Sequence, residues 1–268
     1  MPARPAWFAV AIGLAFAVTL TFLTLPVVAI FVDTSPRELL DSLDDPVARD
    51  ALWLSLETTS ISIALILLVG TPAAWFLATR RFRGRAIAIT LVELPLVLPP
   101  AVAGIALLAA VGPSGILGGL VSDAGIQLVL ETAGVIVALT FVASPFYLRQ
   151  AQAAFGSVDQ TLLDAARTLG ASEARTFARV AIPAAMPSLA AGTALALGRA
   201  LGEFGATLMF AGSFRGITQT VPLAIYDRFA TDFPAALALS AVLVALSAAI
   251  LLSVKLVGGA NVLGSAPH

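Results

Sequence analysis

Cysteine is absent from this sequence of 268 residues, and histidine and lysine occur once each, as His268 and Lys255. The absence of cysteine excludes disulfide frameworks and thiolate catalysis. With one histidine we expect no histidine-based metal site and no histidine proton relay. The net charge is −1, so the chain has no positive excess that would attract nucleic acid.

Motifs for nucleotide binding and for hydrolysis are missing as well. No GxxxxGK[ST] phosphate loop can be written anywhere in the sequence, and neither HExxH nor GxSxG occurs. These motifs bind phosphate or carry metal- and serine-dependent hydrolysis, so we expect no active site in this chain. Nucleotide energy, if it is used, must then come from another subunit.

Hydrophobic residues make up 59% of the sequence and charged residues only 12%, which is typical of an integral membrane protein. A bilayer is crossed by roughly 20 apolar residues. Six segments meet this requirement: residues 7–31, 51–77, 86–111, 133–150, 188–211 and 235–257. We therefore predict an all-α membrane protein with six transmembrane helices.

The basic residues predict the orientation. With the N-terminus inside, ten of them fall on the inner side: Arg4, Arg80, Arg81, Arg83, Arg85, Arg149, Arg167, Arg175, Arg179 and Lys255. Four fall outside, namely Arg37, Arg49, Arg215 and Arg228, while Arg199 lies within a span. The inner excess predicts that both termini are cytoplasmic (N-in, C-in). The cluster at residues 80–85 is interpreted as a topology anchor, and the acidic segment 33–50 as a solvated outer loop.

Residues 164–183 are polar although long apolar runs flank them on both sides. The pattern predicts two short helices, the first ending near Leu169. Gly170 suits a left-handed C-terminal cap and Ser172 an N-cap, and we expect Pro183 to close the unit. Such a segment cannot lie in lipid, so it should face water and a partner.

The same stretch resembles the EAA loop of ABC-importer permeases, whose pattern is EAA-x3-G-x9-I-x-L-P. The matching residues are Asp164, Ala165, Ala166, Gly170, Val180, Ile182 and Pro183. Three of them depart from the pattern conservatively, with Asp for Glu, Val for Ile and Ile for Leu. The resemblance implies that this loop docks into a cytoplasmic ATPase. The alternative is an ordinary amphipathic cytoplasmic loop.

Two charges lie within the fifth predicted span. Arg199 and Glu203 are one helical turn apart, and Thr207 follows one turn later. Charges at membrane depth are costly and therefore point to a function. We consider two interpretations: the stripe lines a translocation path or dimer seam, or the pair is a structural ion pair that locks the bundle.

The third predicted span contains three prolines, Pro95, Pro99 and Pro100, close behind Glu93. Proline removes a backbone donor and clashes with the preceding turn, so this helix must bend or break. Irregular backbone at this depth is tolerated where it is buried or lines a cavity. Glu93, Pro99 and Pro100 are thus further candidates for the path, and a plain packing kink is the alternative.

Three further segments, residues 199–207, 94–100 and 221–226, resemble those of molybdate/tungstate permeases, with the sulfate/thiosulfate permeases as close relatives. This resemblance implies the type I importer permease fold. Residues 1–50 would form an additional first helix and outer loop, 51–257 the permease core with its coupling loop at 151–187, and 258–268 a short tail.

The resemblance also implies the partners and the transport cycle. The partners would be a second copy of the chain, two ATPase subunits that bind ATP and Mg, an external substrate-binding protein and membrane lipid. Import of a tetrahedral oxyanion would proceed by alternating access in the cell membrane. The alternatives are a sulfate/thiosulfate permease and a self-powered secondary anion carrier.

Overall fold

The computed structural model describes residues 6–259, and all its regular elements in this range are helical. Most of the predicted tail, 258–268, therefore lies outside the described residues. The α-helices are α1 (Ala6–Val32), α2 (Pro36–Asp44), α3 (Pro46–Thr79), α4 (Arg85–Val97), α5 (Pro100–Val111), α6 (Gly118–Asp123), α7 (Thr132–Gly156), α8 (Gln160–Thr168), α9 (Glu173–Thr176), α10 (Ile182–Leu201), α11 (Gly205–Ala211), α12 (Val221–Phe229) and α13 (Phe233–Gly259). A π-helical turn, Phe177–Ala181, joins α9 to α10.

Five helical stretches in the described range are long and apolar enough to cross a membrane: Trp7–Val32, Pro46–Thr79, Thr132–Gly156, Glu173–Leu201 and Phe233–Ser253. They overlap five of the six predicted spans, although Glu173–Leu201 covers only the first part of the predicted span 188–211. The remaining predicted span, 86–111, is divided between the shorter helices α4 and α5. The all-helical membrane class is thus confirmed, and the sixth crossing stays a prediction.

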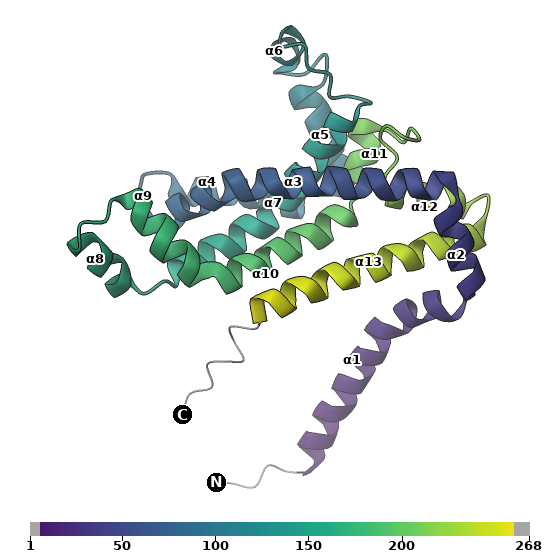
Figure 1. Cartoon of the computed structure of the whole chain (residues 1–268), viewed down its shortest axis with the longest axis horizontal. Helices are drawn as coiled ribbons and strands as arrows, with labels where there is room; N and C mark the ends of the chain where they lie inside the picture. The colour runs from purple at the N-terminus through teal and green to yellow at the C-terminus, as the bar shows by residue number, and fades with distance from the viewer. Residues whose placement is uncertain (1–5, 260–268) are drawn as a thin grey trace.

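The centre of the molecule is a bundle in which α3, α7, α10 and α13 run side by side (Figure 1). Glycines let these helices approach closely. A Cβ on Gly70 of α3 would lie 3.2 Å from the Tyr147 ring of α7, and one on Gly192 of α10 would lie 2.9 Å from the Gln150 side chain. The Tyr147 hydroxyl lies 2.6 Å from that of Thr71, so the buried phenol is hydrogen-bonded. Small residues therefore permit tight helix packing here.

Helix α1 lies apart from the bundle for most of its length (Figure 1), and large apolar side chains such as Trp7 and Phe22 are exposed along it. A helix that is apolar on all sides must be covered by lipid or by another protein. The interpretation of residues 1–50 as an addition to the core stays a prediction.

The segment 33–50, expected to be a solvated loop, is mostly helical. Ser35 and Glu38 form a capping box at the start of α2, with each side chain accepting a hydrogen bond from the other's backbone N–H. Asp45 then caps α3 by accepting from the Val47 N–H at 2.8 Å. Both caps precede a proline at the first helical position, which favours a helix start.

Candidate functional site

The predicted break at Gly170 is present in the structure. Gly170 has φ +83°, in the left-handed region that favours glycine. The Gly170 N–H donates to the Arg167 carbonyl at 2.9 Å, and the Ala171 N–H donates to the Ala166 carbonyl at 3.0 Å. These are the two bonds of a Schellman cap, which satisfies the last carbonyls of α8.

The predicted N-cap at Ser172 is also present, because its hydroxyl accepts a hydrogen bond from the Arg175 N–H. Pro183, however, does not close the unit. The helix continues from Glu173 to Leu201, and Pro183 lies in the first turn of α10. The π-helical turn before it explains this difference: the Ile182 N–H donates to the Phe177 carbonyl five residues earlier, and this wider turn accommodates the proline ring.

The motif residues divide into an exposed and an anchored group. Asp164, Ala165 and Gly170 are exposed, whereas Val180 and Ile182 pack against the bundle core. The first group belongs to a unit, α8 and α9, that projects at one end of the bundle (Figure 1). A surface presented in this way is available to a partner.

Two leucines that the motif does not include strengthen this view. Leu162 and Leu169 have exposed fractions of 52% and 87%, whereas Leu163 is buried. Exposed apolar side chains beside polar ones are typical of protein-binding surfaces. The signal in the sequence was the apolar character of Leu169 directly before the cap.

Ion pairs tie the unit to the end of α3. Arg80 Nη2 lies 2.7 Å from Glu173 Oε2, and Arg167 lies 3.8 Å from the same carboxylate. Arg167 also donates to Asp164 Oδ1 at 2.8 Å. The cluster at residues 80–85, interpreted as a topology anchor, thus also contacts the coupling segment.

The fifth predicted span, 188–211, was expected to be one continuous helix, and this is wrong. Helix α10 ends at Leu201, α11 begins at Gly205, and Phe204 between them has φ −130°. The break has a physical cause in Glu203, whose Oε1 accepts a hydrogen bond from the Ala206 N–H at 2.7 Å. The carboxylate therefore caps α11 from just outside the helix.

Arg199 and Glu203 form the predicted ion pair, although only Arg199 lies in a helix. The Glu203 side chain is 1% exposed and that of Arg199 26% exposed. Thr207 on α11 is fully buried, and its hydroxyl has no hydrogen-bond partner among the described residues. Burial of this kind fits both a structural lock and a polar path closed in this conformation.

The proline break in the third span is confirmed. Helix α4 ends at Val97 and α5 begins at Pro100. The structure also brings this break against the other one. A Cβ on Gly205 would lie 2.6 Å from Pro100 Cβ, and one on Gly104 would lie 2.6 Å from Met209 Cβ. Two interrupted helices thus meet close to their interruptions, α5 against α11, which sequence spacing alone could not show.

Glu93 is not part of this meeting point. Its Oε1 lies 3.2 Å from Arg149 Nε on α7. Both residues line a small cavity that also contacts Ala78 and Gly156, at the ends of α3 and α7. The structure therefore groups Glu93 with Arg149 and not with Arg199 and Glu203.

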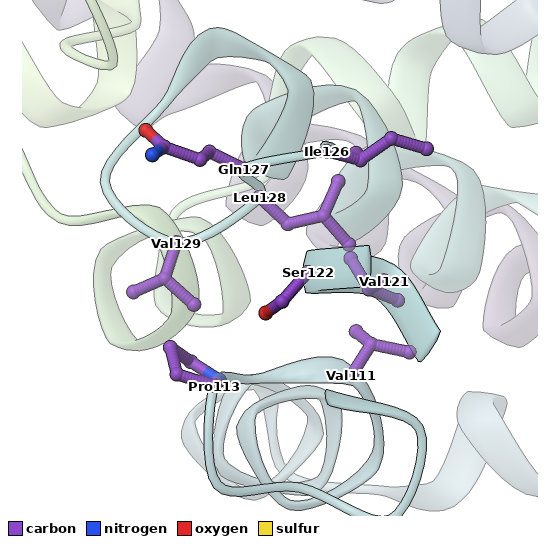
Figure 2. Close-up of a pocket in the computed structure, with 8 residues that line it drawn as sticks. All are labelled: Val111, Pro113, Val121, Ser122, Ile126, Gln127, Leu128 and Val129. Atoms are coloured by element: carbon purple, nitrogen blue, oxygen red, sulfur yellow. The ribbon is translucent and has the colours of Figure 1, made fainter. Parts of the chain in front are cut away.

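A cavity of about 220 Å³ lies between the end of α5 and the segment 112–132, and Figure 2 shows the side chains around it. Ser122 and Gln127 are its polar side chains, and valine, leucine, isoleucine and proline complete the lining. None of the predicted site residues lines it. Because it lacks a charged group, it has no counter-charge for an oxyanion. In the described part of the chain, no cluster of three or more His, Cys, Asp or Glu could hold a metal.

Residues 67–260 match the family described as "Binding-protein-dependent transport system inner membrane component". The "Molybdenum transport system permease protein ModB" of Mycobacterium tuberculosis is 41% identical over 237 residues, which cover 88% of this chain and 89% of that protein. The "Sulfate transport system permease protein CysW" of Escherichia coli K12 is 34% identical over 222 residues, covering 82% and 76%.

The fold matches a solved structure of a bacterial ABC transporter "involved in the import of the acidic polysaccharide alginate". The TM-score is 0.73 at 18% identity, and the match covers 94% of this chain and 95% of that one. At this identity the likeness speaks for the shared permease fold and not for the substrate.

Proposed function

Because the chain belongs to the family of binding-protein-dependent transport system inner membrane components, we propose that it moves a tetrahedral oxyanion, molybdate or tungstate, into the cytoplasm as the permease of an ABC importer. The chain itself would be non-catalytic. ATP and Mg would be bound by two separate ATPase subunits, and an external binding protein would deliver the anion.

The observation that carries this proposal is the exposed unit of α8 and α9. It presents the matched motif residues Asp164, Ala165 and Gly170, with Leu169 beside them, beyond the end of the bundle. Helix α8 is 9 residues long and capped at both ends, and Arg167 links it through Glu173 of α9 to Arg80 at the end of α3, so the unit can transmit a push as a rigid piece. In the proposed cycle, ATP draws two such units together in a homodimer and the bundles tilt.

The positive-inside count supports placing this unit in the cytoplasm. It also implies that both termini lie inside and that α4 and α5 together make the sixth crossing. Half-helices of 13 and 12 residues can cross jointly although neither spans alone. A broken helix at membrane depth is tolerated where it is buried or lines a cavity.

We place the translocation path beside the meeting of α5 and α11. Pro99 and Pro100 interrupt one helix and Glu203 the other, and Arg199 offers a partly exposed guanidinium at the second break. A guanidinium suits an oxyanion through paired N–H donors. Since Glu203 neutralises much of its charge, Arg199 would guide an anion past and not hold it.

The ion is proposed from the higher identity to ModB than to CysW, and sulfate is the competing candidate. The test is ATP-dependent uptake by the chain reconstituted with its ATPase and binding protein, with molybdate, tungstate and sulfate competing. We expect molybdate uptake that tungstate inhibits and excess sulfate does not. Preference for sulfate would overturn the choice of ion.

Two further arms of the same experiment test the mechanism. Accumulation by the chain alone in a proton gradient would indicate a secondary carrier. Arg199→Leu should abolish uptake, because the path loses its guanidinium, and uptake is compared only in the fraction of complex that still assembles, since the variant leaves the buried Glu203 without its partner. Normal uptake in that assembled variant would show that the pair is structural only.

A further inference from the structure

A second polar cavity, of about 470 Å³, lies where the ends of α3 and α7 meet α8. Arginine side chains dominate its lining: Arg80, Arg81, Arg85 and Arg167. Among residues 6–259, no acidic residue lines it. Its function is not explained by docking of an ATPase on the exposed face of α8, because the cavity lies behind that helix, on the side of the buried Leu163.

The charges around the cavity do not cancel. Arg80 and Arg167 share Glu173, and Arg167 also pairs with Asp164. Arg81, in contrast, is exposed, and neither it nor Arg85 forms an ion pair within residues 6–259. Even with both carboxylates counted, four guanidinium groups leave two positive charges uncompensated.

Arg85 is also held in place. Its Nε donates to the carbonyl of Leu77, in the last turn of α3, at 2.8 Å. This bond fixes the plane of a half-buried guanidinium at the cavity wall. A planar guanidinium presents paired N–H donors that match the oxygens of a phosphate.

Two candidate membrane spans end at the cavity, α3 at Thr79 and α7 at Gly156, so the cavity would lie near a membrane surface once both cross. One turn back, Trp75 packs against Phe155 and Phe177 with ring centroids 5.4 and 5.5 Å apart. Tryptophan is enriched at this interfacial level. Headgroups of lipids at this level would reach the arginines.

We propose that this cavity binds the phosphate group of an anionic phospholipid. The headgroup would connect the end of α3, through Arg81 and Arg85, with α8, through Arg167. Basic pockets between transmembrane helices are the typical sites for such headgroups. The inference requires only that α3 and α7 cross the bilayer, and it does not depend on the transported ion.

The test measures lipid binding to the purified full chain in detergent, by native mass spectrometry, with phosphatidylglycerol and with phosphatidylcholine. We expect phosphatidylglycerol to be preferred. In Arg81→Gln/Arg85→Gln its affinity should fall about 25-fold, since each arginine removed near an anionic surface weakens attraction about fivefold. The matched control is Arg37→Gln/Arg49→Gln, which removes the same charge at the opposite end of α3, far from the cavity, and should change the affinity less than about twofold.

Equal losses in the two double variants, or equal binding of both lipids, would overturn the proposal. So would an unchanged lipid affinity together with loss of ATPase association, because the arginines would then contact protein. Inorganic phosphate forms a separate arm. If it displaces phosphatidylglycerol from the wild type but not from Arg81→Gln/Arg85→Gln, the cavity recognises the phosphate group of the lipid. If phosphate binds the cavity and phosphatidylglycerol does not, the ligand is soluble phosphate and the proposal of a lipid is overturned. Should the double variant not fold, Arg81→Gln alone serves, because Arg81 forms no ion pair with any described residue that the fold could lose.

Discussion

Two helix interruptions in this molecule are stabilised in opposite ways. At Gly170 the break faces water, and its backbone groups are satisfied by neighbours within a few residues. At residues 202–204 the break is buried, and Glu203 must supply the acceptor for the first turn of α11 while Arg199 compensates its charge. The first break depends on local conformation, whereas the second depends on a buried charge pair and on α5 packed beside it.

Substitutions at the two breaks should therefore have different effects on the fold. Disturbing the exposed break should leave the bundle intact and disable what the projecting unit does. Disturbing the buried break should weaken the fold itself, because an uncompensated charge or an unsatisfied donor would remain in an apolar surrounding.

The largest effect is expected for Glu203→Leu. It leaves Arg199 without its partner and the Ala206 N–H without an acceptor, so we expect a loss of about 3 kcal/mol in the free energy of unfolding. The measurement is unfolding of the purified chain in detergent. Glu203→Gln should cost less, because its amide oxygen can still accept from Ala206.

Glu173→Leu is the matched control on the exposed side. It also removes a carboxylate from an ion pair, but the Glu173 side chain is 58% exposed. Exposed pairs contribute about 0.2–1 kcal/mol. Similar losses in Glu173→Leu and Glu203→Leu would contradict the distinction between the two breaks.

The exposed break could be predicted from sequence because its determinants are neighbours in the chain. Gly170 and Ser172 are the residue types that a left-handed cap and an N-cap require, and both act within a few residues. The proline break before α5 was predictable for the same reason, since Pro99 and Pro100 lack backbone donors.

The buried break was missed because nothing local forces it. Gly202 has φ −90°, which any residue can adopt, and no proline is near. Glu203 terminates the helix because its carboxylate accepts a hydrogen bond from the Ala206 N–H. Whether the side chain makes this bond or leaves the helix continuous depends on tertiary packing. The usable signal was a charged residue between two glycines within an apolar run.

Pro183 shows the opposite error. Proline usually ends or kinks a helix at the preceding residues, so a closure was expected. The structure instead widens the preceding turn into a π-helix at Phe177–Ala181 and continues to Leu201. Continuing the helix lets Val180 and Ile182 pack on the bundle core. Helix propensity is a local quantity and does not include this tertiary contact, so it could not predict the wider turn.

An intermediate effect is expected for Gly170→Val at the exposed break. A β-branched residue with φ +83° is strained by about 1–2 kcal/mol, which should shift or fray the start of α9. We predict that the bundle unfolds at nearly the wild-type temperature while anion uptake per ATP hydrolysed falls severely in the reconstituted complex.

Gly156→Val is the control for this substitution. Gly156 ends α7 near the same unit, a Cβ there would meet nothing within 4 Å, and its φ is not positive. This variant should retain coupled uptake. Full coupling in Gly170→Val would show that the left-handed cap does not determine the geometry that the partner recognises.

The smallest effect concerns Asp159, the N-cap of α8, which accepts a hydrogen bond from the Thr161 N–H at 2.9 Å. This backbone bond lowers the pKa of Asp159 below its usual value near 3.8. A carboxyl with a lowered pKa stabilises the folded state above that usual value, and the contribution is lost as pH falls through the lowered pKa.

Asp159→Asn separates the cap from its charge, because asparagine caps a helix about as well but does not titrate there. Hydrogen exchange of the α8 amides should be alike in wild type and variant at pH 6. Below pH 3.8 the wild type should lose protection relative to the variant. The neighbouring ion pair of Asp164 and Arg167 is present in both proteins, so its contribution to protection is common to both. If the ratio of amide exchange rates in α8 between wild type and variant stays constant with pH, the charge of Asp159 contributes nothing to the cap. The exposed break is then stabilised by Gly170 and Ser172 alone.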